Sequence, residues 1–191
     1  MWSRFDEARN IDFNSVLWVR AGGNVIVDPL PLSEHDAAHL KELGGAALIV
    51  ITNSDHVRDA EKVAALTHAK LAGPRAEKDA FPIRCDFWLG EGDDPVPGVE
   101  VLEMRGSKTP GELVLVIEGH TLVCGDLVRS HQAGSLTLLP DGKLTDRVAA
   151  IDSARRLLDC TGVKAVLTGD GWPIFRDAHR ALRELMASLD G

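Results

Sequence analysis

The sequence predicts a mixed α/β fold. Two observations carry this prediction: hairpin-type strands and helices alternate along all 191 residues, and the last unit reads as helix, strand and helix. Neither a repeat nor a low-complexity stretch nor a flexible linker divides the chain, so we expect a single domain over residues 1–191. The same mixture of elements excludes an all-α or an all-β domain.

A hairpin and a helix are predicted near the start of the chain. Residues 16–19 and 24–27 are apolar runs on either side of a glycine-rich turn, which is typical of a hairpin. Ser33 and Asp36 then have the spacing of a capping box. A helix should therefore begin there and end near Leu43, before a pair of glycines.

A strand, a helix and an irregular segment are predicted next. Residues 47–51 are apolar and β-branched, which predicts a buried strand. Apolar residues recur at helical spacing from Val57, so we expect a helix to about Lys70, with Pro74 closing its exit. Residues 82–98 are rich in Gly, Pro and Asp, which indicates mostly loop and short strands.

The second half of the chain alternates in the same way. Three strands are predicted first, at 99–103, 112–117 and 121–124. The last two should pair as a hairpin across Glu118-Gly119-His120. Apolar spacing from Val148 predicts a helix that ends near Cys160, followed by a strand at 165–168. A closing helix should carry an apolar stripe from Phe175 to Leu189.

The composition excludes several classes of protein. With 21 Lys+Arg against 29 Asp+Glu the net charge is −8, which argues against nucleic acid or an anionic membrane as partner, because phosphates need a basic surface. The longest apolar run, residues 46–51, is far too short to span a bilayer, and acidic residues near the N-terminus argue against an export signal. The three cysteines lack metal-type spacing, which indicates reduced thiols and a cytoplasmic protein. We expect a small-molecule substrate as partner and consider a homodimer as the assembly.

Acidic side chains follow the predicted strands at the points where those strands end. Asp28, Asp55 with His56, Asp126 and Asp170 each come directly after an apolar run or within a few residues of it. Asp in such a place often serves as a turn residue or helix cap. Because the carboxyl ends of strands commonly form ligand sites in α/β proteins, the repeated pattern favours a site at which these side chains converge.

These segments together resemble the metallo-β-lactamase-like hydrolases over about residues 14–189. Five segments carry the resemblance, and each corresponds to a family motif. They are Asn14 to Asp28 for the first hairpin and its aspartate, Ile49-Val50-Ile51-Thr52-Asn53-Ser54-Asp55-His56 for the strand and loop of H-x-H-x-D-H, Lys108-Thr109-Pro110-Gly111 for H-T-P-G, Leu122-Val123-Cys124-Gly125-Asp126 for the strand that ends in the bridging aspartate, and Gly169-Asp170-Gly171-Trp172-Pro173 for G-H-G-x-P. The resemblance implies a four-layer αββα sandwich and metal-dependent hydrolysis.

The chain departs from the family pattern at the first metal position. The two earlier histidines of the H-x-H segment fall on Ile51 and Asn53, and the third falls on Lys108. An aliphatic side chain cannot bind a metal and an ammonium would repel one, so we expect this position to be empty.

The resemblance implies that the second metal position is retained. Its ligands would be Asp55, His56, Asp126 and Asp170, with an aspartate in place of the usual final histidine. Three carboxylates and one imidazole suit a single divalent ion of zinc, manganese or iron.

The three converging carboxylates need a countercharge, which leaves two functional hypotheses open. In the first, one metal activates water for hydrolysis of a small ester, lactone or thioester. Lys108 would then stabilise an oxyanion, His131 would carry a proton, and Asp55 would be a third catalytic residue. For His131 the alternative interpretation is a solvated loop residue without a catalytic role. In the second, Lys108 pairs with the aspartates in a metal-free binding or sensor protein. A redox-active iron site is a third, less supported reading.

Two tryptophans in predicted loops lie near the inferred site. Trp88 and Trp172 could each wall a substrate pocket or anchor the core. The sequence does not choose between these roles.

Overall fold

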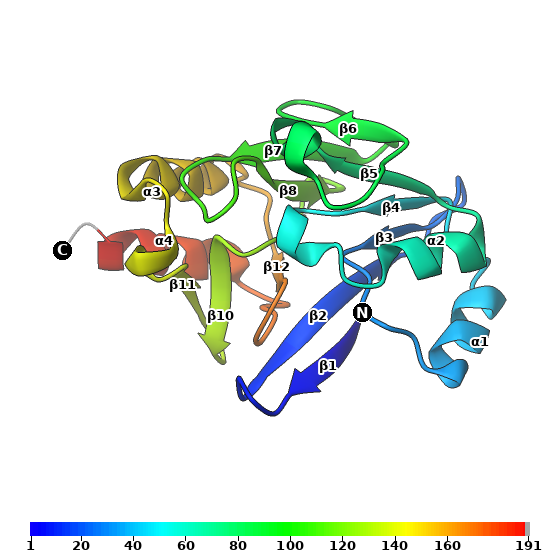
Figure 1. Ribbon diagram of the computed structural model, residues 1–191. Helices are drawn as coiled ribbons and strands as arrows, with labels where there is room; N and C mark the ends of the chain where they lie inside the picture. Colours follow the sequence, from blue (N-terminus) through cyan, green and yellow to red (C-terminus); the bar gives the residue numbers. More distant parts are fainter. Residues whose placement is uncertain (190–191) are drawn as a thin grey trace.

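Two β-sheets stacked face to face form the centre of the computed structural model, which describes residues 1–189 (Figure 1). The larger sheet has the strand order β1-β2-β3-β4-β5-β6 and the smaller one β12-β9-β8-β7. Their strands are β1 Trp2–Asp6, β2 Ile11–Trp18, β3 Val25–Val27, β4 Leu48–Val50, β5 Lys70–Pro74, β6 Phe87–Leu89, β7 Val99–Met104, β8 Glu112–Ile117, β9 Thr121–Cys124 and β12 Ala165–Thr168. A separate two-stranded ribbon is formed by β10 Val128–Gln132 and β11 Ser135–Leu138.

Helices cover the outer face of each sheet and complete four layers. The helices α1 (Glu34–Glu42) and α2 (Ala60–Thr67) lie on the larger sheet, and α3 (Arg147–Arg156) and α4 (Ala178–Leu189) lie on the smaller one (Figure 1). Four short 3-10 turns lie between these elements, at Ser54–His56, Arg75–Ala80, Asp141–Lys143 and Leu157–Asp159. The predicted αββα sandwich is therefore confirmed.

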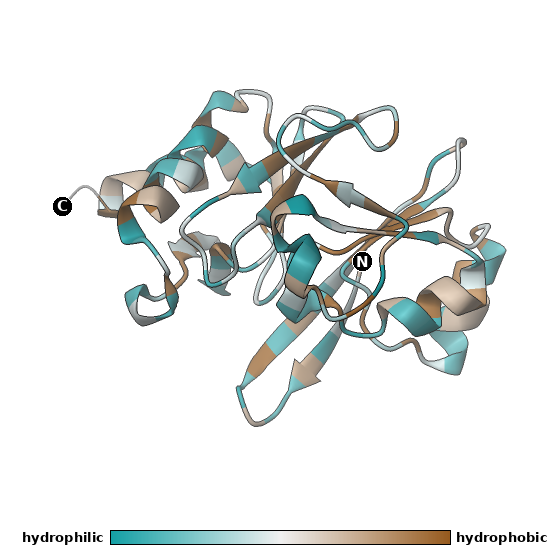
Figure 2. Cartoon of the chain, turned by 45° about the horizontal axis from the view of Figure 1, so that its top comes forward, coloured by the Kyte–Doolittle hydropathy of each residue, from teal (hydrophilic) through white to brown (hydrophobic). Residues whose placement is uncertain are grey.

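Three apolar clusters correspond to the three interfaces between these layers. The central cluster joins the two sheets and includes Val27, Val50 and Leu115. A second cluster packs α3 and α4 on the smaller sheet, and a third packs α1 and α2 on the larger sheet. Figure 2 shows the hydrophobic residues gathered on the central strands. Burial of apolar surface on both faces explains why β3, β4 and β8 read as continuous apolar runs rather than alternating ones.

The direction of the strands brings their carboxyl ends to one edge. β3, β4, β5 and β6 are parallel neighbours in the larger sheet, and β9 and β12 are parallel neighbours in the smaller one. Residues from the loops that follow β3, β4, β9 and β12 line one common cavity at this edge. The backbone N–H of Asn14 on β2 also bonds to Gly169 O at 2.9 Å, which ties the two sheets together there.

Most predicted elements are present, and the local signals explain them. The capping box is formed, with the Ser33 hydroxyl accepting from the Asp36 N–H and the Asp36 carboxylate accepting from the Ser33 N–H. The hairpins β2–β3 and β8–β9 have the predicted antiparallel pairing. No helix within residues 1–189 is both long and apolar enough to cross a membrane.

The sequence expectations were wrong at several positions. The helix expected to reach Lys70 ends at Thr67, because His68 adopts a left-handed conformation and Lys70 begins β5. Pro74 is the last residue of that strand rather than the exit of a helix. Phe175 lies before α4 and is exposed, so it is not part of the apolar stripe.

Three further strands were not predicted: β1, β10 and its partner β11. β1 is a polar and largely exposed edge strand that pairs with β2, so it has no apolar alternation to reveal it. β10 (Val-Arg-Ser-His-Gln) is short and rich in polar residues. β1 and β10 both contribute residues to the polar cavity of the candidate site. Most of their polar side chains therefore face this cavity or solvent instead of packing in an apolar core.

Gly106 is required for the close approach of the β7–β8 loop to α3. Its φ is +78°, and a Cβ atom there would lie 2.2 Å from Asp146 O and 2.4 Å from Ala150 N. Both neighbours are backbone atoms at the start of α3, so they cannot move aside cheaply.

We expect Gly106→Ala to lower the free energy of unfolding by about 2–4 kcal/mol, because it combines a backbone clash with an unfavourable φ. The matched control is Gly142→Ala, where a Cβ would meet nothing within 4 Å. That control should change the stability by less than about 0.5 kcal/mol. Equal denaturant midpoints for Gly106→Ala and the wild type would contradict the packing argument.

Candidate functional site

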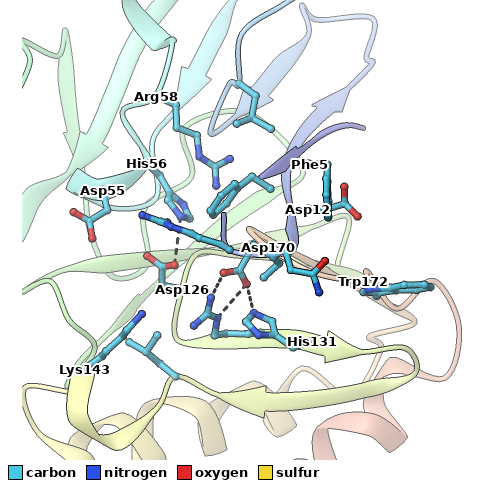
Figure 3. Close-up of a pocket in the computed structure, with 18 of the residues that line it drawn as sticks. Phe5, Asp12, Asp55, His56, Arg58, Asp126, His131, Lys143, Asp170 and Trp172 are labelled. Atoms are coloured by element: carbon cyan, nitrogen blue, oxygen red, sulfur yellow. Dashed lines mark hydrogen bonds and ion pairs between the residues drawn. The ribbon is translucent and has the colours of Figure 1, made fainter. Parts of the chain in front are cut away.

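A polar cavity of about 1120 Å³ lies at the edge where the loops of the two sheets meet (Figure 3). It is lined by residues from β1 and β2, from the loops after β4, β7, β9 and β12, and from β10. All six residues proposed from the sequence as catalytic or metal-binding line it: Asp55, His56, Lys108, Asp126, His131 and Asp170. Asp55, Asp126 and Asp170 therefore converge on one cavity, whereas Asp28, the fourth strand-end acid, is not among its lining residues.

His56 lies between two carboxylates at the base of the cavity. Its Nδ1 is 2.8 Å from Asp28 Oδ2, and its Nε2 is 3.5 Å from Asp126 Oδ1. Burial lowers the pKa of His56, but Asp28 and the hydrogen bonds to both carboxylates outweigh burial and raise the pKa to about 9. At neutral pH the ring is therefore a cation with both nitrogens acting as donors.

Asp28 is held in place by the residues that follow β4. Its carboxylate accepts from the Thr52 N–H at 2.8 Å and from the Thr52 hydroxyl at 2.6 Å, besides the contact with His56. Asp28 has φ +51°, a left-handed conformation that non-glycine residues seldom adopt. Three hydrogen bonds to one side chain explain how this conformation is maintained.

Lys108 reaches from the β7–β8 loop to a position between two aspartates. Its Nζ lies 2.7 Å from Asp55 Oδ2 and 2.7 Å from Asp126 Oδ2. Burial lowers the pKa of Lys108, but the contacts with Asp126 and then Asp55 outweigh burial and raise it, so the amine is charged. Burial likewise raises the pKa of Asp126, yet His56 and Lys108 together hold that pKa well below its usual range. Lys108 thus pairs with both Asp55 and Asp126, the contact that the second sequence hypothesis requires.

Asp170 forms a second, separate charge cluster. Arg129 binds it through two nitrogens, with Nε 3.1 Å from Oδ1 and Nη2 in contact with Oδ2. His131 Nε2 lies 3.2 Å from the same Oδ1 (Figure 3). A forked guanidinium matches a carboxylate in geometry as well as charge, so both Asp170 oxygens are engaged.

Arg58 ties the strand ends together behind these clusters. Its guanidinium donates to the carbonyl oxygens of Asn14, Asp28 and Gly169, at distances of 2.5, 3.0 and 3.0 Å. Burial lowers the pKa of Arg58, while three nearby aspartates raise it. Because the carbonyls belong to the β2, β3 and β12 segments, one side chain fixes the relative positions of three elements around the cavity.

Glu112 is a fully buried acid beneath the cavity, at the start of the otherwise apolar strand β8. Its carboxylate accepts from the Ser107 hydroxyl at 2.7 Å and from the Leu127 N–H at 2.8 Å. Burial, and then the negative charge of Asp126, raise the pKa of Glu112 to about 7. This side chain links the loop of Lys108 to the loop after Asp126.

As they are arranged, these side chains do not fit a divalent metal. The Lys108 ammonium lies between two of the predicted ligands, both Asp170 oxygens face Arg129, and both His56 nitrogens face carboxylates. Within residues 1–189, no group of three or more His, Cys, Asp or Glu side chains is placed to hold a metal ion. The four-residue metal site therefore stays a prediction, and the folded arrangement counts against it.

The structure places both residues that the resemblance puts at the H-x-H part of the first metal position. Ile51 is fully buried in the apolar cluster under α1 and α2. Asn53 uses its side chain for structure: its Nδ2 donates to Asp126 Oδ2 at 3.2 Å, and its Oδ1 accepts from the Asp55 N–H at 3.0 Å.

Several residues of the site were missed by the sequence reasoning. Arg129 went unnoticed because it lies on β10, a strand that was not predicted. Arg58 carried no signal, because its partners are backbone carbonyls far away in sequence. Glu112 could have been found, since an acid that opens a fully apolar run is unusual.

The two tryptophan candidates have different roles. Trp172 lines the cavity. Trp88 lies on β6 and packs against Phe81 in an edge-to-face contact with centroids 5.4 Å apart. Of the two roles considered for Trp88, core anchor and pocket wall, the structure therefore supports the core anchor.

Glu112→Gln should remove the loss of folding stability that the wild type suffers as the pH rises and buried Glu112 becomes charged. A raised folded pKa means that the folded state retains its proton while the unfolded state loses it. The wild type should therefore lose stability as the pH rises from about 4.5 through about 7. The glutamine variant keeps the shape without the charge, so relative to the wild type it should gain about 3 kcal/mol between pH 5 and pH 8.

Urea unfolding at a series of pH values measures this difference. Glu100→Gln is the matched control, because Glu100 lies exposed on the neighbouring strand β7. A constant difference between Glu112→Gln and the wild type from pH 5 to pH 8 would show that Glu112 is charged throughout this range.

Comparison with known proteins agrees with the fold. A family model described as the metallo-beta-lactamase superfamily matches residues 1–189. No curated protein sequence matches the chain.

Solved structures of similar shape cover nearly the whole chain. TTHA1623 in a di-iron-bound form is 18% identical, with a TM-score of 0.74 over 97% of this chain and 98% of that one. The DIM-1 metallo-beta-lactamase is 19% identical, with a TM-score of 0.74 over 98% and 92% of the two chains. A metallo-beta-lactamase from Pontibacter korlensis is 15% identical, with a TM-score of 0.74 over 100% and 93%.

The TM-scores establish a shared fold, but sequence identities this low do not show which substrate or metal this chain binds. The family model is the stronger finding, because it spans all but the last two residues. The chain therefore belongs to the metallo-β-lactamase superfamily, a membership that supports a metal-dependent hydrolase in general.

Proposed function

We propose that this chain is a divergent member of its superfamily that binds a small molecule without a resident divalent metal. The observation that carries the proposal is the Lys108 ammonium, 2.7 Å from both Asp55 and Asp126. A fixed positive charge there neutralises the carboxylates that would otherwise attract a metal cation. The cavity stays open to solvent and is large enough for a small organic ligand.

The other carboxylates support the same conclusion. Asp170 is paired with Arg129, and Asp28 is paired with His56. Asp28, Asp126 and Asp170, the buried aspartates of the site, thus each have a cationic neighbour supplied by the chain itself. Breaking such a pair by removing one partner typically costs about 3–5 kcal/mol, so the side chains are not free to turn toward a metal at little cost.

The wild-type protein should therefore carry little metal. Protein produced in medium supplemented with zinc, manganese and iron should contain less than about 0.1 ion per chain by elemental analysis, since stoichiometric sites retain their ion through purification. Chelator treatment should leave the thermal midpoint unchanged. About one tightly held ion per chain, with a lower midpoint after chelation, would overturn the proposal.

Removing the lysine charge should create affinity for a metal. In Lys108→Met, Asp55 and Asp126 lose their cation and remain beside His56, so Zn²⁺ should bind at least about tenfold more tightly than to the wild type. Lys41→Met, on the exposed surface of α1, is the matched control and should behave as the wild type. Competition with a chromogenic chelator measures both. Unchanged zinc affinity in Lys108→Met would mean that Lys108 is not what opposes the metal.

Metal-dependent hydrolysis of a small ester, lactone or thioester is the second candidate. Superfamily membership favours it, as does the presence of Asp55, His56, Asp126 and Asp170 in one cavity. A panel of chromogenic esters, thioesters and lactones, each with and without added Zn²⁺, Mn²⁺ or Fe²⁺, tests this function directly. Metal-dependent turnover that disappears in Asp126→Asn would establish the hydrolase over the binding protein.

A further inference from the structure

The cavity has two ends of different chemistry. Figure 3 shows Asp55, His56 and Asp126 on one side, Phe5 and Trp172 on the other, and Asp170 with His131 between them. Lys143 lies on the side of Asp126 (Figure 3). A ligand that fills this space would therefore meet charged groups at one end and aromatic rings at the other.

The charges that line the cavity leave positive charge available to a ligand. Cationic side chains outnumber acidic ones, with five Lys or Arg against four Asp in a protein whose net charge is −8. Lys108 and Arg129 are largely neutralised by aspartates. Lys143 lines the cavity and has no acidic partner within residues 1–189.

At the charged end of the cavity, some lysine N–H groups also remain without a hydrogen-bond acceptor among residues 1–189. An ammonium has three N–H donors, and Lys108 directs two of them at Asp55 and Asp126, so one remains. Lys143 keeps all three. An anionic group seated here could accept hydrogen bonds from these lysines and would neutralise the unpaired charge of Lys143.

The aromatic end has apolar surface that the protein itself does not cover. Phe5 is 57% exposed and Trp172 is 59% exposed, although both line the cavity. Large apolar side chains left open at a cavity mouth commonly mark a binding surface. A flat apolar group laid against them would bury surface that is now in water.

The backbone around Trp172 is fixed rather than loose. The Trp172 N–H donates to Ser130 O at 2.7 Å. Gly171 before it has φ +79°, and a Cβ at that position would lie 2.0 Å from the same oxygen. Because the aromatic ring starts from a fixed backbone position, binding need not order a flexible loop.

Asp12 limits what the apolar part of the ligand can carry. It lines the cavity beside Phe5 and has no side-chain partner within residues 1–189 (Figure 3). A second negative charge at this end would be repelled, whereas an uncharged body or an N–H or O–H donor would be accepted.

We propose that the cavity binds an organic anion with one negatively charged head and a flat, uncharged apolar body, the class to which aromatic carboxylates belong. The head lies at Lys143 and Lys108, and the body lies against Phe5 and Trp172. The inference rests on the proposed function of a metal-free binding protein.

Titration calorimetry with three probes tests the ligand class. The probes are 2-naphthoate, its uncharged counterpart 2-naphthamide, and acetate, which has the head without the body. With the wild-type protein at low ionic strength, 2-naphthoate should bind at least about tenfold more tightly than either of the others. Equal affinities for 2-naphthoate and 2-naphthamide would overturn the charged head, and equal affinities for 2-naphthoate and acetate would overturn the apolar body.

Two variants assign the two ends of the cavity. Lys143→Met should bring the affinities for 2-naphthoate and 2-naphthamide to within about twofold of each other, because it removes the charge that discriminates them. Trp172→Leu should weaken both probes by at least about fivefold and keep their ratio. A purely structural defect would not separate the two probes in this way.

Matched controls lie outside the cavity. Lys41→Met removes an exposed charge from α1, and Phe175→Leu removes an exposed ring that does not line the cavity. Neither should change any of the three affinities. If Lys143→Met retains the full preference for 2-naphthoate, or if Phe175→Leu weakens binding as much as Trp172→Leu, the proposal is wrong.

The elemental analysis distinguishes failure of this inference from failure of the proposed function. A protein that holds stoichiometric metal overturns the proposed function. A metal-free protein that shows no preference for 2-naphthoate overturns the ligand class alone.

Discussion

The neutralisation of buried carboxylates between the two sheets is the constraint on which this site depends. Asp28, Asp126 and Asp170 are all buried, and an uncompensated charge at such depth costs several kcal/mol. The chain supplies a cation for each from another segment: His56 for Asp28, Lys108 for Asp126 and Arg129 for Asp170. Because these partners lie on different loops, satisfying the charges also fixes the loops against one another.

The same ion pairs affect how strongly the cavity can bind a metal cation. A carboxylate that already faces an ammonium or a guanidinium has less to offer a divalent ion, and the nearby positive charge repels such an ion. Replacing ligands by cations thus changes the site without changing the fold. The superfamily architecture remains, and the charge pattern is the reason why we propose a small-molecule ligand in place of a metal.

Backbone strain accompanies this arrangement. Asp28 and Arg58 both have positive φ, at 51° and 46°, in the two segments that follow β3 and β4. Each is held by several hydrogen bonds, Asp28 by Thr52 and His56 and Arg58 by three carbonyl oxygens. Strain of this kind persists where surrounding contacts over-determine a conformation, and it is common at functional sites.

The sequence by itself determined the mixed α/β class, most strands of both sheets and six of the polar residues that converge on the cavity. These features are local, because apolar runs, a capping box and acids at strand ends are visible within a few residues. Only the tertiary structure decided which charges pair. Arg129 meets Asp170 across 41 residues and Arg58 meets Gly169 across 111, and contacts this distant leave no local pattern. Lys108 was visible in the sequence as a departure from a metal motif, but its position between two aspartates exists only after the sheets have packed.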